Sequence, residues 1–227
     1  MLGPLLAFPF ATANIPVLML ATWVILFFLG LIAAGFVSRA LLAGPRPEVE
    51  VGVLWHLIRV YSRLIHRLRV QGAENWPDPD HAGPLIIVAN HTAGVDPLLV
   101  QGSVRFEIRW IMAQDMRYAI LEWFWQIARI IFVDRQSGDM SGTREAIRHV
   151  KAGGVLGIFP EGGLERPGRT ILPFQPGVGM IIRRTGARVL PLVITGTPVA
   201  DEAWQSLLRT SRSVLTVHPP ITYKGSE

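Results

Sequence analysis

The chain has 227 residues, of which 50% are hydrophobic and only 17% are charged, and it contains no cysteine. Soluble domains usually carry charge on roughly a quarter of their residues, so part of the hydrophobic surface is expected to face lipid. The absence of cysteine excludes disulfide bonds, thiolate catalysis and cysteine-based metal sites. The net charge of +5 is carried almost entirely by arginine, which suits phosphate recognition. Anionic lipid is the expected partner, because no interleaving of aromatic and basic residues indicates nucleic-acid binding.

The first 38 residues contain no charged side chain. Within them, Val17–Val37 is long and apolar enough to cross a bilayer as a helix, and Pro16 suits its first turn. A cleaved signal peptide is the alternative, but such a peptide needs a positively charged segment ahead of its apolar stretch. The first charges, Arg39 and Arg46, follow the apolar stretch. Positive charge on that side predicts that the rest of the chain lies in the cytoplasm.

The next segment has the periodicity of an amphipathic helix. Apolar residues recur at helical spacing from Val53 to Leu68, while arginines fall mostly on the other faces. We expect a basic amphipathic helix over residues 51–70. It either lies in the lipid headgroup layer with its apolar side down or packs on the core of the following domain. The expected organisation is a membrane anchor over residues 1–48 and a globular domain over residues 49–227.

From residue 85 onward, short apolar runs alternate with longer mixed segments. Two of the longer segments, 139–152 and 176–185, are predicted to be helices. This alternation is typical of an α/β domain. The runs expected to form buried strands are 85–89, 108–112, 130–133, 155–159, 189–194 and 214–217.

A histidine and an aspartate follow the first of these strands. His91 and Asp96 are five residues apart, with Gly94 between them to allow a bend. The carboxylate can bind one ring nitrogen and stabilise the imidazolium, which leaves the other nitrogen as a general base for a hydroxyl. The alternatives are a structural histidine and an aspartate that caps the helix beginning at Pro97.

Two further groups of polar residues also follow predicted strands. Glu161 and Gly162 come after the 155–159 strand, where a glutamate can bind a ligand hydroxyl or an arginine; the alternative is a solvent-facing turn residue. Arg135 follows Asp134 after the 130–133 strand, where its guanidinium is placed for phosphate recognition. A surface Asp–Arg pair of little energetic weight is the alternative there.

Together these blocks resemble the lysophosphatidic acid acyltransferase (glycerolipid acyltransferase) family over roughly residues 50–220. The family's His-x4-Asp motif is matched within NHTAGVD, its apolar block ending in Asp-Arg by IFVDR at 131–135, and its Phe-Pro-Glu-Gly motif by residues 159–162. Pro173, Phe174 and Gly177 match a further Pro-Phe block, and VLPLVI at 189–194 matches the family's last apolar run.

The resemblance implies a glycerolipid acyltransferase fold, namely a mixed, mostly parallel sheet flanked by helices, preceded by the membrane helix and the amphipathic helix. It implies that His91 is the catalytic base, that Asp96 orients it, and that Arg135, Glu161 and Gly162 bind the acceptor. The implied acyl donor is acyl-CoA or acyl carrier protein as co-substrate, and no cofactor and no metal are expected. The default reaction converts 1-acyl-glycerol-3-phosphate to phosphatidic acid at a membrane.

The sequence departs from the family pattern after Phe-Pro-Glu-Gly. The family continues with Thr or Ser, then Arg, then Ser, whereas this chain has Gly163, Leu164 and Glu165, and Arg129 replaces a usual glycine ahead of the second block. Arg166 and Arg169 are the candidates to supply the missing charge. Another acceptor, such as a lyso amino-acid lipid, is therefore an alternative. A lipid transacylase or hydrolase and an inactive lipid-binding protein are the others.

Overall fold

The computed structural model describes residues 15–134, 139–165, 170–200 and 202–223. The chain divides into two compact units, Met1–Leu41 and Leu42–Glu227. The first contains a single long helix in its described part, α1 (Ile15–Leu42). Its segment Met19–Leu42 is long and apolar enough to cross a membrane, judged by length and composition. The helix expected over Val17–Val37 is present, and it extends beyond that range at both ends.

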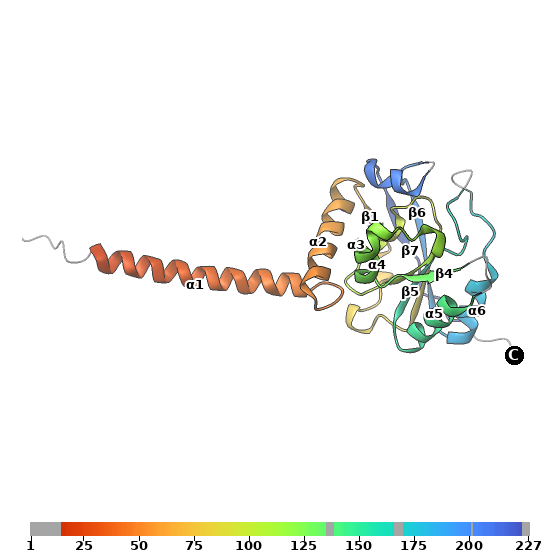
Figure 1. The fold of residues 1–227 in the computed structure, drawn as a ribbon, viewed down its shortest axis with the longest axis horizontal. Coiled ribbons are helices and arrows are strands. Elements are labelled where there is room, and N and C mark those ends of the chain that lie inside the picture. Colours follow the sequence, from red (N-terminus) through yellow and green to blue (C-terminus); the bar gives the residue numbers. More distant parts are fainter. Residues whose placement is uncertain (1–14, 135–138, 166–169, 201, 224–227) are drawn as a thin grey trace, which may run out of the picture. The chain divides into compact units, whose positions relative to one another are not determined.

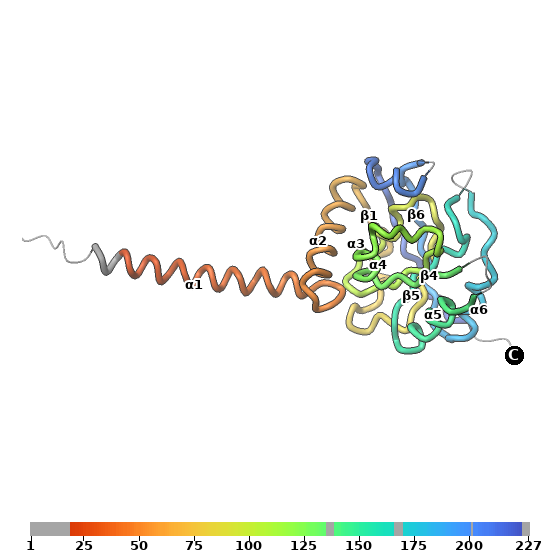
Figure 2. The backbone as a smooth tube through the Cα atoms, viewed as in Figure 1, coloured from red at the N-terminus to blue at the C-terminus, as the bar shows by residue number. Residues whose placement is uncertain are grey.

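The second unit is built around a seven-stranded sheet with the order β1-β7-β6-β2-β5-β3-β4. Every neighbouring pair is parallel except β6 and β7, which are antiparallel. The predicted mixed, mostly parallel sheet is therefore confirmed. Figure 2 traces the backbone through it. The strands are β1 (Arg69–Gln71), β2 (Leu85–Ala89), β3 (Arg109–Ala113), β4 (Ile131–Val133), β5 (Val155–Ile158), β6 (Arg188–Thr195) and β7 (Val214–Val217).

Helices cover both faces of this sheet (Figure 1). On one face, strand residues such as Ile87 and Leu190 form a core with Val100 of α3; on the other, Ile86 and Leu156 pack with residues of α5 and α6. Alternate residues of β2 thus enter opposite cores, as strand geometry requires. The helices of this unit are α2 (Val49–Leu64), α3 (Asp96–Ser103), α4 (Glu122–Ile127), α5 (Ser141–Lys151) and α6 (Pro176–Thr185).

Short 3-10 helices of three to six residues occupy several connections of the second unit. They are η2 (Ala73–Asn75), η3 (Pro79–His81), η4 (Gln114–Met116), η5 (Ala119–Leu121) and η6 (Ala203–Leu208). The last of these, η6, lies beside the loop that follows β2, because its Ser206 hydroxyl accepts a hydrogen bond from the Val95 amide at 3.1 Å.

One face of helix α2 packs against the rest of the second unit, and another face is apolar and exposed to solvent. Trp55 is buried, and its indole N–H donates to the Val104 carbonyl at 2.7 Å. The helix expected to continue to residue 70 ends at Leu64, because Arg67 takes a left-handed backbone with φ 44° and β1 begins soon afterwards. The apolar residues that form the exposed stripe are Val49, Val53, Leu57, Val60 and Leu64.

A buried histidine joins the end of α2 to the C-terminal part of the chain. His66 Nε2 lies 2.8 Å from the Tyr61 hydroxyl and Nδ1 lies 2.8 Å from the Ser211 hydroxyl. Tyr61 donates its own proton to the Leu207 carbonyl at 2.7 Å, so it accepts from Nε2–H while Nδ1 accepts from Ser211. Burial lowers the pKa of His66, and the Asp96 carboxylate acts in the opposite direction. The network therefore holds a neutral imidazole.

Candidate active site

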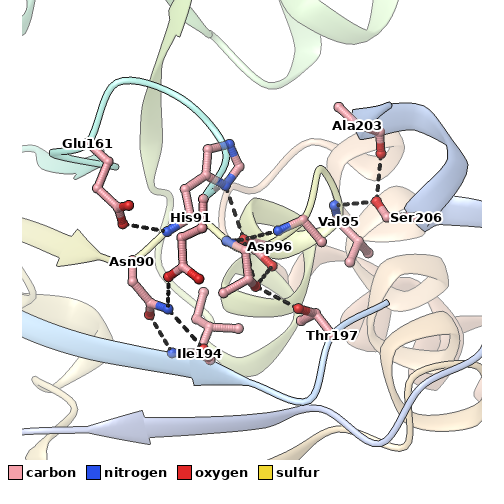
Figure 3. A network of polar contacts seen from close by, with 12 residues as sticks. Asn90, His91, Val95, Asp96, Glu161, Ile194, Thr197, Ala203 and Ser206 are labelled. Carbon is pink, nitrogen blue, oxygen red and sulfur yellow. Dashed lines mark hydrogen bonds and ion pairs between the residues drawn. The ribbon is translucent and has the colours of Figure 1, made fainter. Parts of the chain in front are cut away.

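The histidine and the aspartate of the first motif lie side by side just beyond β2 (Figure 3). His91 is the second residue after β2, and Asp96 is the first residue of α3. Their side chains meet with His91 Nδ1 3.0 Å from Asp96 Oδ2. The loop between them is compact because Gly94 packs against η6, where an added Cβ would lie 2.4 Å from the Ala203 carbonyl oxygen. Close approach, rather than an unusual φ, is what requires glycine here.

The Asp96 carboxylate is fully buried and is held by several donors. Its Oδ2 accepts from the Thr92 amide at 2.7 Å and from the Ala93 amide at 2.8 Å. Its Oδ1 accepts from the Thr92 hydroxyl at 3.1 Å. These donors precede Asp96 in the chain, and the N-cap position of α3 is held by Val95. The alternative role as a helix cap is therefore wrong, and the carboxylate is fixed in place to face His91.

The imidazole of His91 rests on a stack of aromatic rings. Its ring is nearly parallel to that of Phe159 with centroids 4.0 Å apart, and Phe159 is stacked on Trp110 at 4.8 Å. Gly157 makes room for this stack, because an added Cβ would lie 2.5 Å from the Trp110 ring. The His91 side chain is 19% exposed. With Nδ1 bound to Asp96, Nε2 is the nitrogen left for chemistry.

Glu161 reaches the same loop from the turn that follows β5, the strand next to β2. Its Oε1 accepts a hydrogen bond from the His91 amide at 3.1 Å, and its Oε2 accepts from the Leu172 amide at 2.9 Å. The side chain is only 4% exposed, so the alternative of a solvent-facing turn glutamate is wrong. Gly162 follows with φ 71°, a conformation that favours glycine. The described contacts of Glu161 place the backbone of His91.

Two polar residues at this site were missed by the sequence analysis. Asn90 joins β2 to β6: its side-chain oxygen accepts from the Ile194 amide at 2.7 Å and its nitrogen donates to the Ile194 carbonyl at 3.0 Å. The same nitrogen donates to Glu165 Oε1 at 3.0 Å, and the Glu165 amide donates to the His91 carbonyl at 2.8 Å. Glu165 is 2% exposed. The residue that breaks the family pattern is thus part of the site, which its position beside Phe-Pro-Glu-Gly could have indicated.

None of the three arginines expected near the acceptor lies within the described part of the chain. Arg135, Arg166 and Arg169 lie outside the described residues. Leu164, where the family has arginine, is described and half-buried. Within the described part of the chain, no group of three or more His, Asp or Glu is placed to hold a metal ion.

Arg129, which replaces a usual glycine of the family, has a left-handed backbone with φ 48°. That conformation explains why glycine suits the position. The Arg129 guanidinium lies 3.5 Å from Glu107 and 3.9 Å from Glu48. Glu48 and Glu107 also contact Arg46, at 3.2 and 3.4 Å. The arginine therefore joins a charged cluster beside the start of α2.

The model of the Acyltransferase family matches residues 67–195, which include both catalytic candidates and Glu161. The chain belongs to the Acyltransferase family. The lysophosphatidic acid acyltransferase resemblance predicted from the motifs is confirmed, and the protein is an acyltransferase. The arrangement of helices and strands is similar to that of a solved structure.

That solved structure is the 1-acyl-sn-glycerophosphate (LPA) acyltransferase PlsC from Thermotoga maritima. It is similar to this acyltransferase with a TM-score of 0.59 and 26% identity, over 92% of this chain and 84% of that one. A 1-acyl-sn-glycerol-3-phosphate acyltransferase of Limnanthes douglasii is 26% identical over 84% of this chain and 68% of its own length. The protein of that name from Borreliella burgdorferi is 30% identical over 58% of this chain. The chain spans about half of the Borreliella protein, 52% of its length.

Proposed function

We propose that this acyltransferase is a membrane-bound O-acyltransferase in which His91 Nε2 removes the proton from a lysolipid hydroxyl. The observation that carries the proposal is the 3.0 Å contact between His91 Nδ1 and the buried Asp96, which leaves Nε2 free. The deprotonated oxygen attacks the thioester carbonyl, the carbon–sulfur bond breaks, and the imidazolium returns its proton to the departing thiolate. Asp96 stabilises the imidazolium throughout. A thioester is a good acyl donor, so a base and positioning suffice without a covalent enzyme intermediate.

The proposed default acceptor is 1-acyl-glycerol-3-phosphate, which gives phosphatidic acid. The names of the Limnanthes, Borreliella and Thermotoga relatives support this choice. Arg135, Glu161 and Gly162 are proposed to bind the acceptor, as the family resemblance implies. A different lysolipid, such as a lyso amino-acid lipid, is the second candidate acceptor. The reason is the altered turn of Gly163, Leu164 and Glu165, in which a leucine replaces the arginine of the family.

Membrane attachment is proposed through residues 1–48 together with α2, with residues 49–227 as the acyltransferase domain. The apolar length of Met19–Leu42 supports the first part. The exposed apolar stripe of α2 supports the second, because a surface of this kind is favourable in the headgroup layer. The arginines that follow the apolar segment support a cytoplasmic location of the domain. The acyl donor is then acyl-CoA or acyl carrier protein.

A panel of acceptors tests the proposal. Purified full-length protein in lipid nanodiscs is given labelled acyl-CoA or acyl carrier protein with lysophosphatidic acid, lysophosphatidylcholine or a lyso amino-acid lipid. Phosphatidic acid as the main product supports the default acceptor. Exclusive acylation of another lysolipid would instead support the second candidate, with the acceptor chosen by the 163–165 turn. Release of labelled fatty acid without any acylated lipid would identify a hydrolase and contradict the proposal.

A further inference from the structure

A second place suited to phosphate lies away from the His91–Asp96 pair, between α2 and α3. A pocket of about 240 Å³ is lined there by residues of α2, β1 and the end of α3, namely Arg59, Ser62, Arg63, Leu68, Val70, Gly102 and Ser103. Asp96 begins α3 and Ser103 ends it. At 1.5 Å per residue the two ends are about 10 Å apart. We call this cavity the α2–α3 pocket.

The α2–α3 pocket is strongly positive and has no carboxylate of its own. Arg59 and Arg63 line it, and a third arginine, Arg105, lies close enough to Arg59 to act on it electrostatically. Burial lowers the pKa of Arg59, and the positive charges of Arg63 and Arg105 lower it further. Within the described part of the chain, none of the three forms an ion pair with a carboxylate, in contrast to Arg46 and Arg129.

The pocket also contains a buried hydroxyl with no partner. Ser62 is 1% exposed, and its Oγ has no hydrogen-bond partner among the described residues. Such a group costs folding free energy unless something binds it. Ser62 Oγ lies close to Gly102, where an added Cβ would be 3.1 Å away, so a side chain on α3 would close this side of the pocket.

Two of the three arginines, Arg59 and Arg105, lie over the ring of Trp55. The Arg59 guanidinium lies 5.0 Å from the centre of the Trp55 ring, and the Arg105 guanidinium lies 5.9 Å from it. The indole N–H already binds the carbonyls of Gln101 and Val104 at the end of α3. These carbonyls therefore do not need the guanidinium groups of Arg59 and Arg105 as donors, and the guanidinium N–H groups are available to an anion.

We propose that the α2–α3 pocket binds the phosphate of an anionic membrane phospholipid, at a site separate from the reacting centre. The position of the pocket on α2 favours a lipid over a free anion. Arg63 follows the exposed Val60 by three residues and Arg59 by four, so it stands between the apolar stripe and the pocket on the helix surface. A lipid whose tails lie along the stripe has its headgroup at Arg63, with Arg59 and the Ser62 hydroxyl beyond.

The site rests on the proposed membrane contact of α2 but not on the proposed acyl transfer. Binding is measured by calorimetry on the full chain in non-ionic detergent, with dioctanoyl phosphatidylglycerol, dioctanoyl phosphatidylcholine and inorganic phosphate as probes. Phosphatidylglycerol is chosen because it is neither substrate nor product of the proposed reaction. The parent is expected to bind it at one saturable site, at least about tenfold more tightly than phosphatidylcholine or inorganic phosphate.

Three variants make the test specific. The double variant Arg59→Gln/Arg63→Gln is expected to weaken phosphatidylglycerol binding at least about tenfold, the loss expected when charge-assisted hydrogen bonds are removed. The charge-matched control Arg183→Gln/Arg184→Gln, on exposed positions of α6, is expected to stay within about twofold of the parent. Ser62→Ala is expected to weaken binding several-fold while raising the melting temperature, which a merely structural serine would not do.

Equal loss of binding in the two double variants would overturn the proposal, since nonspecific charge would then explain it. Inorganic phosphate binding as tightly as the lipid would overturn the lipid assignment. Acyl transfer by Arg59→Gln/Arg63→Gln is expected within about twofold of the parent. Its loss would overturn the separation of the two sites. A parent that binds phosphatidylglycerol as stated but transfers no acyl group would contradict the proposed function and leave the pocket standing.

Discussion

Replacing Asp96 by asparagine removes one charge from the proposed catalytic pair while preserving its shape. The amide oxygen of asparagine can take the place of Oδ2, where it still accepts from His91 Nδ1 and from the Thr92 and Ala93 amides. The amide nitrogen then occupies the place of Oδ1, beside the Thr92 hydroxyl, which can act as an acceptor. The hydrogen-bonded loop is therefore expected to survive, and the protein to fold.

What the variant loses is the attraction between the carboxylate and the imidazolium that forms when His91 takes a proton. Two unit charges about 4 Å apart interact with about 4 kcal/mol at an effective dielectric constant of about 20. Lost from the transition state alone, that energy corresponds to roughly a thousandfold fall in kcat. KM is expected to change little, because Asp96 is fully buried behind His91 and does not reach the substrate.

The assay is initial-rate transfer of a labelled acyl group from its thioester to the preferred lysolipid, with circular dichroism as the check on folding. Asp80→Asn is the matched control, because Asp80 is an exposed aspartate on η3. A folded Asp96→Asn protein with kcat within about tenfold of the parent would refute the reasoning. So would an equal fall for Asp80→Asn.

Three further predictions concern strain, pH and packing. Arg129→Gly relieves a left-handed backbone that costs about 1–2 kcal/mol in residues other than glycine. It removes only half-exposed ion pairs, so the urea midpoint of its unfolding is expected to be no lower than the parent's. The urea midpoint of Arg129→Ala, which keeps the strain and loses the ion pairs, is expected to fall below both. Because burial lowers the pKa of His66 and of His149 in the folded chain, unfolding takes up protons as pH falls through about 6.5. The free energy of unfolding should therefore drop between pH 7 and 5, and drop less steeply in His66→Gln/His149→Gln; an unchanged slope would count against this. Gly157→Ala is expected to lower kcat at least tenfold by displacing the aromatic stack under the catalytic histidine, while Gly163→Ala, where an added Cβ meets nothing within 4 Å, should match the parent.

The strands were predictable from sequence because their apolar runs are short, β-branched and bounded by turns. The six predicted strands are all present, with ends within one residue of those expected. The strand that was missed, β1, is Arg-Val-Gln. It has one apolar residue and pairs with β7, a strand that comes much later in the chain, so only the tertiary fold defines it. The predicted amphipathic helix was too long at its C-terminal end, because Arg67 takes a left-handed backbone just before β1.

The site was predictable as far as local spacing determines it. The spacing of five positions from His91 to Asp96, placed after a buried strand, predicted their contact. The long-range hydrogen bonds were not predictable in the same way. Asn90 is bound to a residue more than a hundred positions away, and Glu165 reaches the backbone of His91 from a different strand connection. A single sequence gives no period or spacing for such contacts, because they depend on which strands become neighbours in the sheet.

The most direct test of the account is single-turnover acyl transfer by His91→Ala beside His81→Ala, measured in nanodiscs with the preferred lysolipid and labelled thioester. His81 is a suitable control because its side chain is 85% exposed and lies outside the site. We predict that His91→Ala slows transfer by roughly 10²- to 10⁴-fold, while its melting temperature and membrane binding match the parent. His81→Ala is expected to transfer at the parental rate. Transfer by folded His91→Ala at the parental rate would contradict the assignment of His91 as the base.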